Sequence, residues 1–187
     1  FDMPIEMVTP VMRSRAKAVN FGIVYGIGAF SLSKDIGVTR KEADSYIKSY
    51  LESFSGVAKY MDSTIAEAKL NGYVTTLFGR RRYLPELSSS NGMLRAFGER
   101  VARNAPIQGT AADIIKLAML KTHEFLKNSP LRAKLILQVH DELILEVHAD
   151  DADVIKQKLK EIMESVVSLS VPLKADANIG RTWFDLK

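Results

Sequence analysis

Two short apolar runs separated by three polar residues constrain the fold of this chain more than any other feature. The runs cover about residues 133–139 and 143–147 and are typical of buried strands, and His140-Asp141-Glu142 lies between them. A break this short predicts two antiparallel strands joined by a tight turn. A helix is expected over about residues 151–167 and a last strand over about 173–179. The C-terminal third is therefore predicted to be an antiparallel sheet with a helix packed on it.

The rest of the chain is predicted to be mainly helical. Thr9-Pro10 supplies an N-cap and a first-turn proline for a helix to about Tyr25, after which two glycines are expected to loosen the chain. Thr39-x-x-Glu42 is a capping box that opens a second helix to about residue 54. A third helix is expected over about 56–70.

A basic hairpin and two more helices follow in the prediction. Residues 73–84 are rich in β-forming side chains around Gly79 and predict a hairpin, and residues 88–92 predict a loop. Helices are expected over about 93–104 and 109–127, separated by Pro106. The fold class is therefore α+β, with two lobes at residues 1–105 and 106–187.

The composition is that of a soluble globular protein, with 47% hydrophobic and 26% charged residues. Its apolar runs fall short of the roughly 18 residues that span a bilayer, and residues 1–10 do not resemble a signal peptide. The first residue is not Met, which indicates a piece of a longer protein. The absence of cysteine excludes disulfides and thiolate metal sites, and it fits a cytoplasmic location.

Positive charge is concentrated in the first part of the chain. Residues 1–110 hold 15 Lys and Arg against 10 Asp and Glu, whereas residues 111–187 hold 11 against 12. The densest run is Arg80-Arg81-Arg82, between Gly79 and Tyr83. Such a run is typical of a solvated face, and beside a glycine turn and a tyrosine it also indicates nucleic-acid binding.

Two cations and two aromatic residues recur at every fourth position of the first predicted helix. Arg13, Lys17, Phe21 and Tyr25 would form one slowly winding stripe. A polyanion with a flat apolar end would satisfy all four side chains. The alternative is that the two aromatic residues are core while the cations extend to solvent.

The polar turn between the two apolar runs is a candidate cation site. Asp141 and Glu142 are adjacent carboxylates, which repel one another unless a cation such as Mg²⁺ holds them. The alternative is an ordinary exposed hairpin turn.

The segment Met12–Gly26 resembles the fingers-helix motif Arg-x3-Lys-x6-Tyr-Gly of family A DNA polymerases, and His140-Asp141-Glu142 resembles the His-Asp-Glu motif of their palm. The resemblance implies that Arg13 and Lys17 bind the β- and γ-phosphates of a dNTP, which makes Lys17 a catalytic residue as well. Phe21 would pack against the sugar, and Tyr25 would lie at the insertion site beside the template base.

In the palm, the resemblance makes Asp141 a catalytic residue and a ligand of two Mg²⁺ ions, with Glu142 as an auxiliary carboxylate and His140 as a contact to the primer terminus. The implied reaction is two-metal nucleotidyl transfer from dNTP to a primer 3′-hydroxyl.

Primer–template DNA is the other implied partner. By resemblance, Gln108 and Asn104 lie near its minor groove, where amides can bond the acceptors that all base pairs share. Arg100 would contact the duplex or template, and one or more of Arg80, Arg81 and Arg82 would bind backbone phosphates. Residues 1–105 would be the fingers, and 106–187 the C-terminal part of the palm.

One family segment, resembling Asp-Tyr-Ser-Gln-Ile-Glu-Leu-Arg, does not occur in these 187 residues. It supplies a further metal-binding Asp and a palm strand, so the chain is expected to bind Mg²⁺ weakly and to be inactive without the N-terminal palm and thumb. It is also expected to expose a sheet edge through which it could self-associate.

Three other functions stay open. The chain could be a non-catalytic nucleic-acid-binding module or a helical interaction or scaffold domain. It could also be a relative of phage and mitochondrial RNA polymerases, which share the Arg/Lys/Tyr-Gly helix and the His-Asp dipeptide. Phe21-Gly22 and the His-Asp-Glu turn favour the DNA enzyme.

Overall fold

A computed structural model describes residues 4–186, which form the predicted α+β fold. The described range leaves out residues 1–3 and 187, which are the outer ends of the two predicted lobes. Residues 1–3 also belong to the segment that was compared with signal peptides. The chain divides into two compact units, Phe1–Ile107 and Gln108–Lys187. None of the described helices is both long and apolar enough to cross a membrane.

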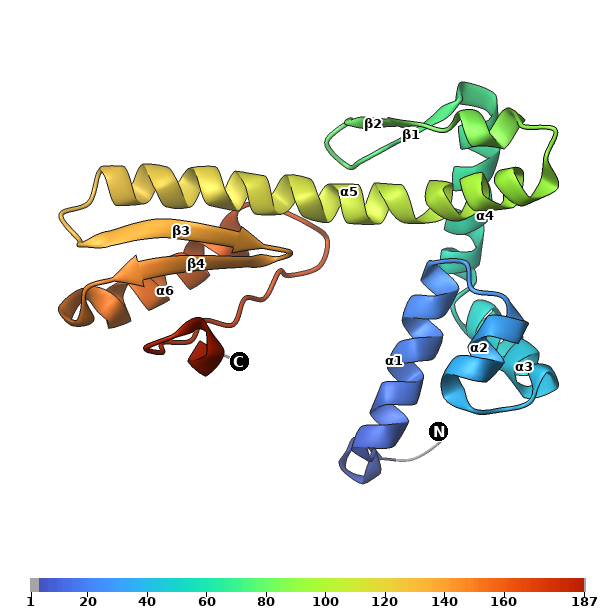
Figure 1. Cartoon of the computed structure of the whole chain (residues 1–187), viewed down its shortest axis with the longest axis horizontal. Helices are drawn as coiled ribbons and strands as arrows, with labels where there is room; N and C mark the ends of the chain where they lie inside the picture. The colour runs from blue at the N-terminus through green and yellow to red at the C-terminus, as the bar shows by residue number, and fades with distance from the viewer. Residues whose placement is uncertain (1–3, 187) are drawn as a thin grey trace. The chain divides into compact units, whose positions relative to one another are not determined.

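The first unit begins with a run of helices (Figure 1), and the first three α-helices share one small core. After the 3-10 turn η1 (Ile5–Met7) come α1 (Pro10–Val24), α2 (Ala29–Ile36), α3 (Arg40–Ser53) and α4 (Ser55–Asn71). Leu32, Ile36 and Ala43 are buried together, and Ala18 and Val19 of α1 pack against them.

The predicted helix ends are confirmed where the sequence carries explicit capping residues. The Thr9 hydroxyl accepts a hydrogen bond from the backbone N–H of Met12 at 3.3 Å. Thr39 and Glu42 make both bonds of the capping box at the start of α3. Gly72, in the left-handed conformation at φ 76°, ends α4.

Helix α2 was not predicted, because Gly26 and Gly28 indicated a loosened chain. The structure shows why a helix forms there. Leu32 and Ile36 are four residues apart and bury 100% and 93% of their surface in the shared core. Tertiary packing therefore stabilises a helix whose local signals are weak.

The predicted basic hairpin is confirmed as β1 (Tyr73–Thr75) and β2 (Arg81–Tyr83), followed by the 3-10 turn η2 (Pro85–Ser88). Arg80 lies in the connecting turn, and Arg81 and Arg82 lie on the return strand. A second core of the unit lies beneath the hairpin and consists of Ile65, Ala68, Val74, Leu84, Leu87 and Ala102.

The predicted break at Pro106 is wrong: a single helix, α5, runs from Gly92 to Lys127 with the proline inside it. A proline inside a helix removes one hydrogen bond and tends to kink or break it. Ala102 before it belongs to the core beneath the hairpin, and Ile115 after it belongs to the core of the second unit. Pro106 is itself buried, and burial of its apolar ring offsets part of the cost of the lost hydrogen bond.

In the second unit, a hairpin and a helix pack with the second half of α5 (Figure 1). Strands β3 (Ala133–Val139) and β4 (Glu142–Val147) are antiparallel, and η3 (Ala149–Asp151) leads into α6 (Ala152–Ser165). Their core contains Ile115, Ala118, Leu143 and Val166. The predicted strands, turn and helix are thus confirmed.

Two expectations for this unit are wrong. Residues 173–179 form no strand, and the chain ends in the 3-10 turn η4 (Trp183–Leu186). A strand needs a pairing partner, and among the described residues β3 and β4 pair only with each other. Strand β3 is also not buried: a bulge between Leu135 and Leu137 interrupts its register, and Ile136 and Leu137 are 49% and 46% exposed.

Candidate functional site

The four residues of the predicted stripe lie exposed on α1 and at its C-cap. Phe21 and Tyr25 are 45% and 40% exposed, and their ring centroids are 6.0 Å apart. The ammonium of Lys17 lies 5.8 Å from the Phe21 ring centroid, and Arg13 is exposed one turn earlier. The alternative that the aromatic residues are core is therefore wrong.

The opposite face of α1 explains this exposure. Ala18 and Val19 pack against the core shared with α2 and α3, and Ile23 is 3% exposed. The hydroxyl of Tyr50 on α3 donates a hydrogen bond of 2.6 Å to Asn20 Oδ1. Helix α1 is thus held from one side, and the stripe faces away from it.

The end of α1 lies against α5, within the first unit. Gly26 has φ 76°, and a Cβ added there would lie 2.9 Å from Arg103 Nη1 and 3.2 Å from Arg100 Cγ. The structure therefore brings Arg100 beside the Tyr25–Gly26 end of the stripe. Arg103 lies there as well and was not among the predicted site residues. Its spacing of three residues from Arg100 on a predicted helix indicated that the two arginines share one helix face.

Asn104 follows directly and has an unusual environment. Its Oδ1 atom and the Nε atom of Arg103 are buried, and neither has a hydrogen-bond partner within residues 4–186. A buried polar atom without a partner is costly, which makes Arg103 and Asn104 candidates for contact with a ligand.

The basic hairpin is stabilised at its turn by Thr76. The buried Thr76 hydroxyl accepts hydrogen bonds from the backbone N–H groups of Phe78 at 3.3 Å and Arg80 at 3.2 Å. Arg81 and Arg82 occupy consecutive strand positions and therefore project from opposite faces of the hairpin.

The acidic turn has the predicted position in the second unit. His140 has φ 52°, and its carbonyl accepts a 2.6 Å hydrogen bond from the Gln138 amide. Asp141 and Glu142 are exposed, and the adjoining Leu143 is buried and anchors the turn. Asp141 thus lies in the two-residue turn, whereas Glu142, predicted to be part of the turn, is the first residue of β4 and pairs with Val139. Both carboxylates are open to solvent.

The donor chemistry of this turn fits Mg²⁺, but its donor set is incomplete. Mg²⁺ is commonly bound by one or two carboxylates together with waters and substrate phosphates. The described part of the chain has no group of three or more His, Asp or Glu side chains that could hold a metal ion. Asp141 and Glu142 could therefore hold Mg²⁺ only with ligands from elsewhere.

The predicted residues divide between the two units. The first unit holds the stripe, the three arginines of the hairpin, Arg100 and Asn104. The second holds Gln108, His140, Asp141 and Glu142.

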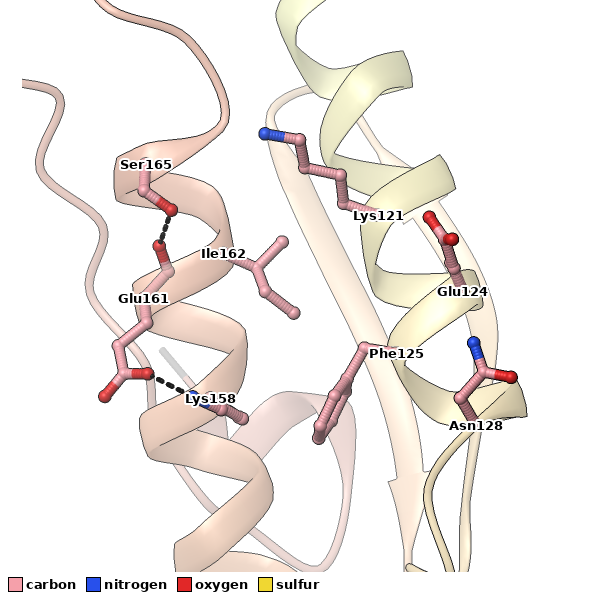
Figure 2. Close-up of a pocket in the computed structure, with 8 residues that line it drawn as sticks. All are labelled: Lys121, Glu124, Phe125, Asn128, Lys158, Glu161, Ile162 and Ser165. Atoms are coloured by element: carbon pink, nitrogen blue, oxygen red, sulfur yellow. Dashed lines mark hydrogen bonds and ion pairs between the residues drawn. The ribbon is translucent and has the colours of Figure 1, made fainter.

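A groove in the second unit contains none of the predicted residues. It lies between α5 and α6 and has a volume of about 550 Å³ (Figure 2). Both of its lysines already have partners: Lys158 Nζ lies 2.8 Å from Glu161 Oε2, and Lys121 Nζ donates to the carbonyl of Val166 at 3.1 Å. We assign no role in the site to this groove.

Comparison with known proteins gives consistent matches. Residues 1–185 match DNA polymerase family A. The chain is 52% identical over 187 residues to DNA polymerase I of Bacillus subtilis and to that of Geobacillus stearothermophilus, and it spans 21% of the length of each. The polymerase domain of Pol1 from M. smegmatis, solved in complex with DNA primer-template and dNTP, is 43% identical with a TM-score of 0.93; the match covers 98% of this chain and 32% of that one.

Proposed function

The chain belongs to DNA polymerase family A, and on that premise we propose that it forms the fingers and the C-terminal part of the palm of a template-directed DNA polymerase. The observation that carries the proposal is the exposed stripe on α1, where two cations precede two aromatic rings. The M. smegmatis relative, whose structure contains DNA and dNTP, supports these two partners. A cytoplasmic location remains part of the proposal.

The stripe binds the incoming dNTP. Arg13 and Lys17 bind its β- and γ-phosphates through charge-assisted hydrogen bonds, and Phe21 packs against the sugar. Lys17 also neutralises charge that develops on the phosphates during transfer. Tyr25 lies at the insertion site, where the end of α1 meets Arg100.

The acidic turn holds the metal. Asp141 is the principal ligand, with Glu142 as an auxiliary carboxylate, and His140 contacts the primer terminus. When bound there, Mg²⁺ supplies the positive charge that favours a primer alkoxide and a leaving pyrophosphate. Ligands missing from the described residues come from a segment outside this chain.

The DNA contacts come from both units. Asn104 and Gln108 donate to minor-groove acceptors through the NH2 groups of their side-chain amides. Arg100 contacts the template side, and Arg80, Arg81 and Arg82 bind backbone phosphates.

Primer extension by a complete polymerase chain that contains this segment tests the proposal. We expect Asp141→Asn to lower the rate by at least about a hundredfold, because the variant binds more weakly the Mg²⁺ that stabilises transition-state charge. Glu146→Gln, which removes another exposed carboxylate from the same hairpin, is the matched control and is expected to retain the rate.

An unchanged rate in the Asp141 variant, with DNA binding retained, would favour a non-catalytic DNA-binding module. Absence of any affinity for DNA or dNTP would favour a scaffold domain. Preferential use of ribonucleotides would favour the RNA-synthesising relative.

A further inference from the structure

The hairpin of β1 and β2 has an outer face that phosphate binding does not explain. Tyr73 pairs with Tyr83 and Thr75 with Arg81, while Val74 between them is buried in the core. Alternate residues of a strand point to opposite faces of a sheet. Tyr73, Arg81 and Tyr83 therefore share the face turned away from the core, which we call the aromatic face.

The three side chains of the aromatic face contact one another. The rings of Tyr73 and Tyr83 are 5.7 Å apart and meet edge to face. The guanidinium of Arg81 lies 4.7 Å from the Tyr73 ring centroid, and its hydrogen bond with Tyr83 raises the pKa of Arg81. Tyr83 nevertheless remains 64% exposed. A large ring is thus held in place by its neighbours and is open to solvent.

The backbone beneath this face is fixed. Val74 and Leu84 are 6% and 1% exposed, and Leu84 N–H donates to the Gly72 carbonyl at 2.9 Å. Thr76 closes the turn with the two hydrogen bonds described above. A ligand would therefore meet a preorganised surface and would lose little affinity to ordering it.

The positive charge of the hairpin that carries the aromatic face favours an anionic ligand. Residues 70–85 contain three arginines and no acidic residue. Proteins bind single-stranded nucleic acid by combining positive charge along the backbone with aromatic rings and arginine planes on which bases stack. In a double helix the base faces are occupied by neighbouring bases, so only an unpaired base can use such a ring.

We propose that the aromatic face is a stacking site for an unpaired base of single-stranded DNA, with Tyr83 as the ring that the base covers. The arginines of the hairpin bind the flanking phosphates. The inference rests on the proposed function for the identity of the ligand, and it adds a base-dependent contact to the phosphate contacts proposed above.

An oligomer of dT and an abasic oligomer of the same length separate the two kinds of contact, because both carry the same phosphates. Fluorescence anisotropy at low salt would measure their binding to the 187-residue chain. We expect dT to bind about tenfold more tightly, since stacking of one base on an aromatic side chain contributes about 1–3 kcal/mol and tenfold corresponds to about 1.4 kcal/mol.

Variants at one position then locate the contact. Tyr83→Ala is expected to remove most of the preference for dT, whereas Tyr83→Phe keeps the ring and is expected to retain it. The matched control is Tyr46→Ala on α3, because Tyr46 is another tyrosine of the first unit and is 47% exposed. It is expected to leave the preference unchanged.

The outcomes distinguish this inference from the proposed function. Equal binding of the dT and abasic oligomers overturns the stacking site but leaves DNA binding through phosphates intact. If the preference for dT over the abasic oligomer survives Tyr83→Ala, the assignment of Tyr83 as the stacking ring is overturned as well. No binding of either oligomer by the unmodified chain counts against DNA as the partner and overturns both proposals.

Discussion

Arg13 and Lys17 lie one turn apart on the exposed face of α1, so their proposed role in phosphate binding can be separated from any role in folding. We predict that Arg13→Ala and Lys17→Ala each weaken dNTP binding by about tenfold or more, because a hydrogen bond to a charged group contributes about 1.5–3 kcal/mol. Equilibrium titration of the chain with dNTP at low salt measures the loss.

Arg15 is the control for this prediction. It is an exposed cation of the same helix but lies two residues away from Arg13 and Lys17, off the stripe. Arg15→Ala should reduce dNTP affinity only slightly, and the salt dependence of binding should stay that of the unmodified chain. If it weakens binding as much as Arg13→Ala does, the chain attracts the anion by its general positive charge and the stripe has no specific role.

Gly26 and Gly37 allow backbone strain to be separated from crowding. Both have positive φ, at 76° and 69°, but a Cβ at Gly26 would approach Arg103 and Arg100, whereas nothing lies within 4 Å of one at Gly37. We predict that Gly37→Ala lowers the free energy of unfolding by about 1–2 kcal/mol, the cost of the left-handed conformation. Gly26→Ala should lower it further. Urea unfolding measures both, and equal losses would mean that Arg100 and Arg103 move aside freely.

At the scale of elements, the capping box of α3 makes stability depend on pH. Hydrogen bonds from the Thr39 hydroxyl and then from its backbone N–H lower the pKa of Glu42 below its ordinary value of 4.5. The ionised carboxylate is thus favoured in the folded chain. Its stabilising contribution is fully present above about pH 4.5 and is lost as the pH falls through the lowered pKa.

We therefore predict that Glu42→Gln destabilises the chain at pH 7 and that the difference from the unmodified chain shrinks as the pH approaches 3. Urea unfolding across this range measures the difference. Glu67→Gln, at an exposed position of α4, is the control and should show a smaller change with pH. A difference for Glu42→Gln that is constant with pH would contradict the prediction.

The elements that the sequence predicted best are those whose signals are local. Thr9 and the Thr39–Glu42 pair fix helix starts through hydrogen bonds within one turn, so the residues alone reveal them. Helix α2 depends on packing against α1 and α3, which its own residues do not reveal. Helix α5 continues through Pro106, and the burial of that residue could not be predicted from its neighbours in the sequence. The predicted strand over 173–179 failed for the same reason, because a strand exists only with a partner.

The candidate site likewise has features that local sequence signals predicted and features that depend on tertiary contacts. Helical periodicity placed Arg13, Lys17, Phe21 and Tyr25 on one face, which the structure bears out. The approach of Arg103 to Gly26 could not be predicted, because it joins residues 77 positions apart through tertiary contacts. The functional roles of all these residues remain predictions.

At the scale of the whole molecule, the two units carry different parts of the proposed reaction. The first carries the side chains proposed to bind the dNTP, and the second carries Asp141 and Glu142. The sheet edges and the exposed Ile136 and Leu137 of the second unit are consistent with the predicted self-association, which sedimentation would test.

The last prediction concerns the 187-residue chain on its own. We expect it to bind DNA weakly and in a salt-sensitive manner but not to extend a primer in the presence of Mg²⁺. The side chains proposed to contact phosphates lie within the first unit, so DNA binding can persist without the rest of a polymerase. Nucleotidyl transfer needs a metal site. Among the described residues, no third acidic or histidine side chain is placed to complete such a site with Asp141 and Glu142. A primer-extension assay checks this directly, with the Asp141→Asn chain, purified in the same way, as a measure of contaminating polymerase. Extension by the unmodified chain that the Asp141 variant lacks would show that two carboxylates suffice.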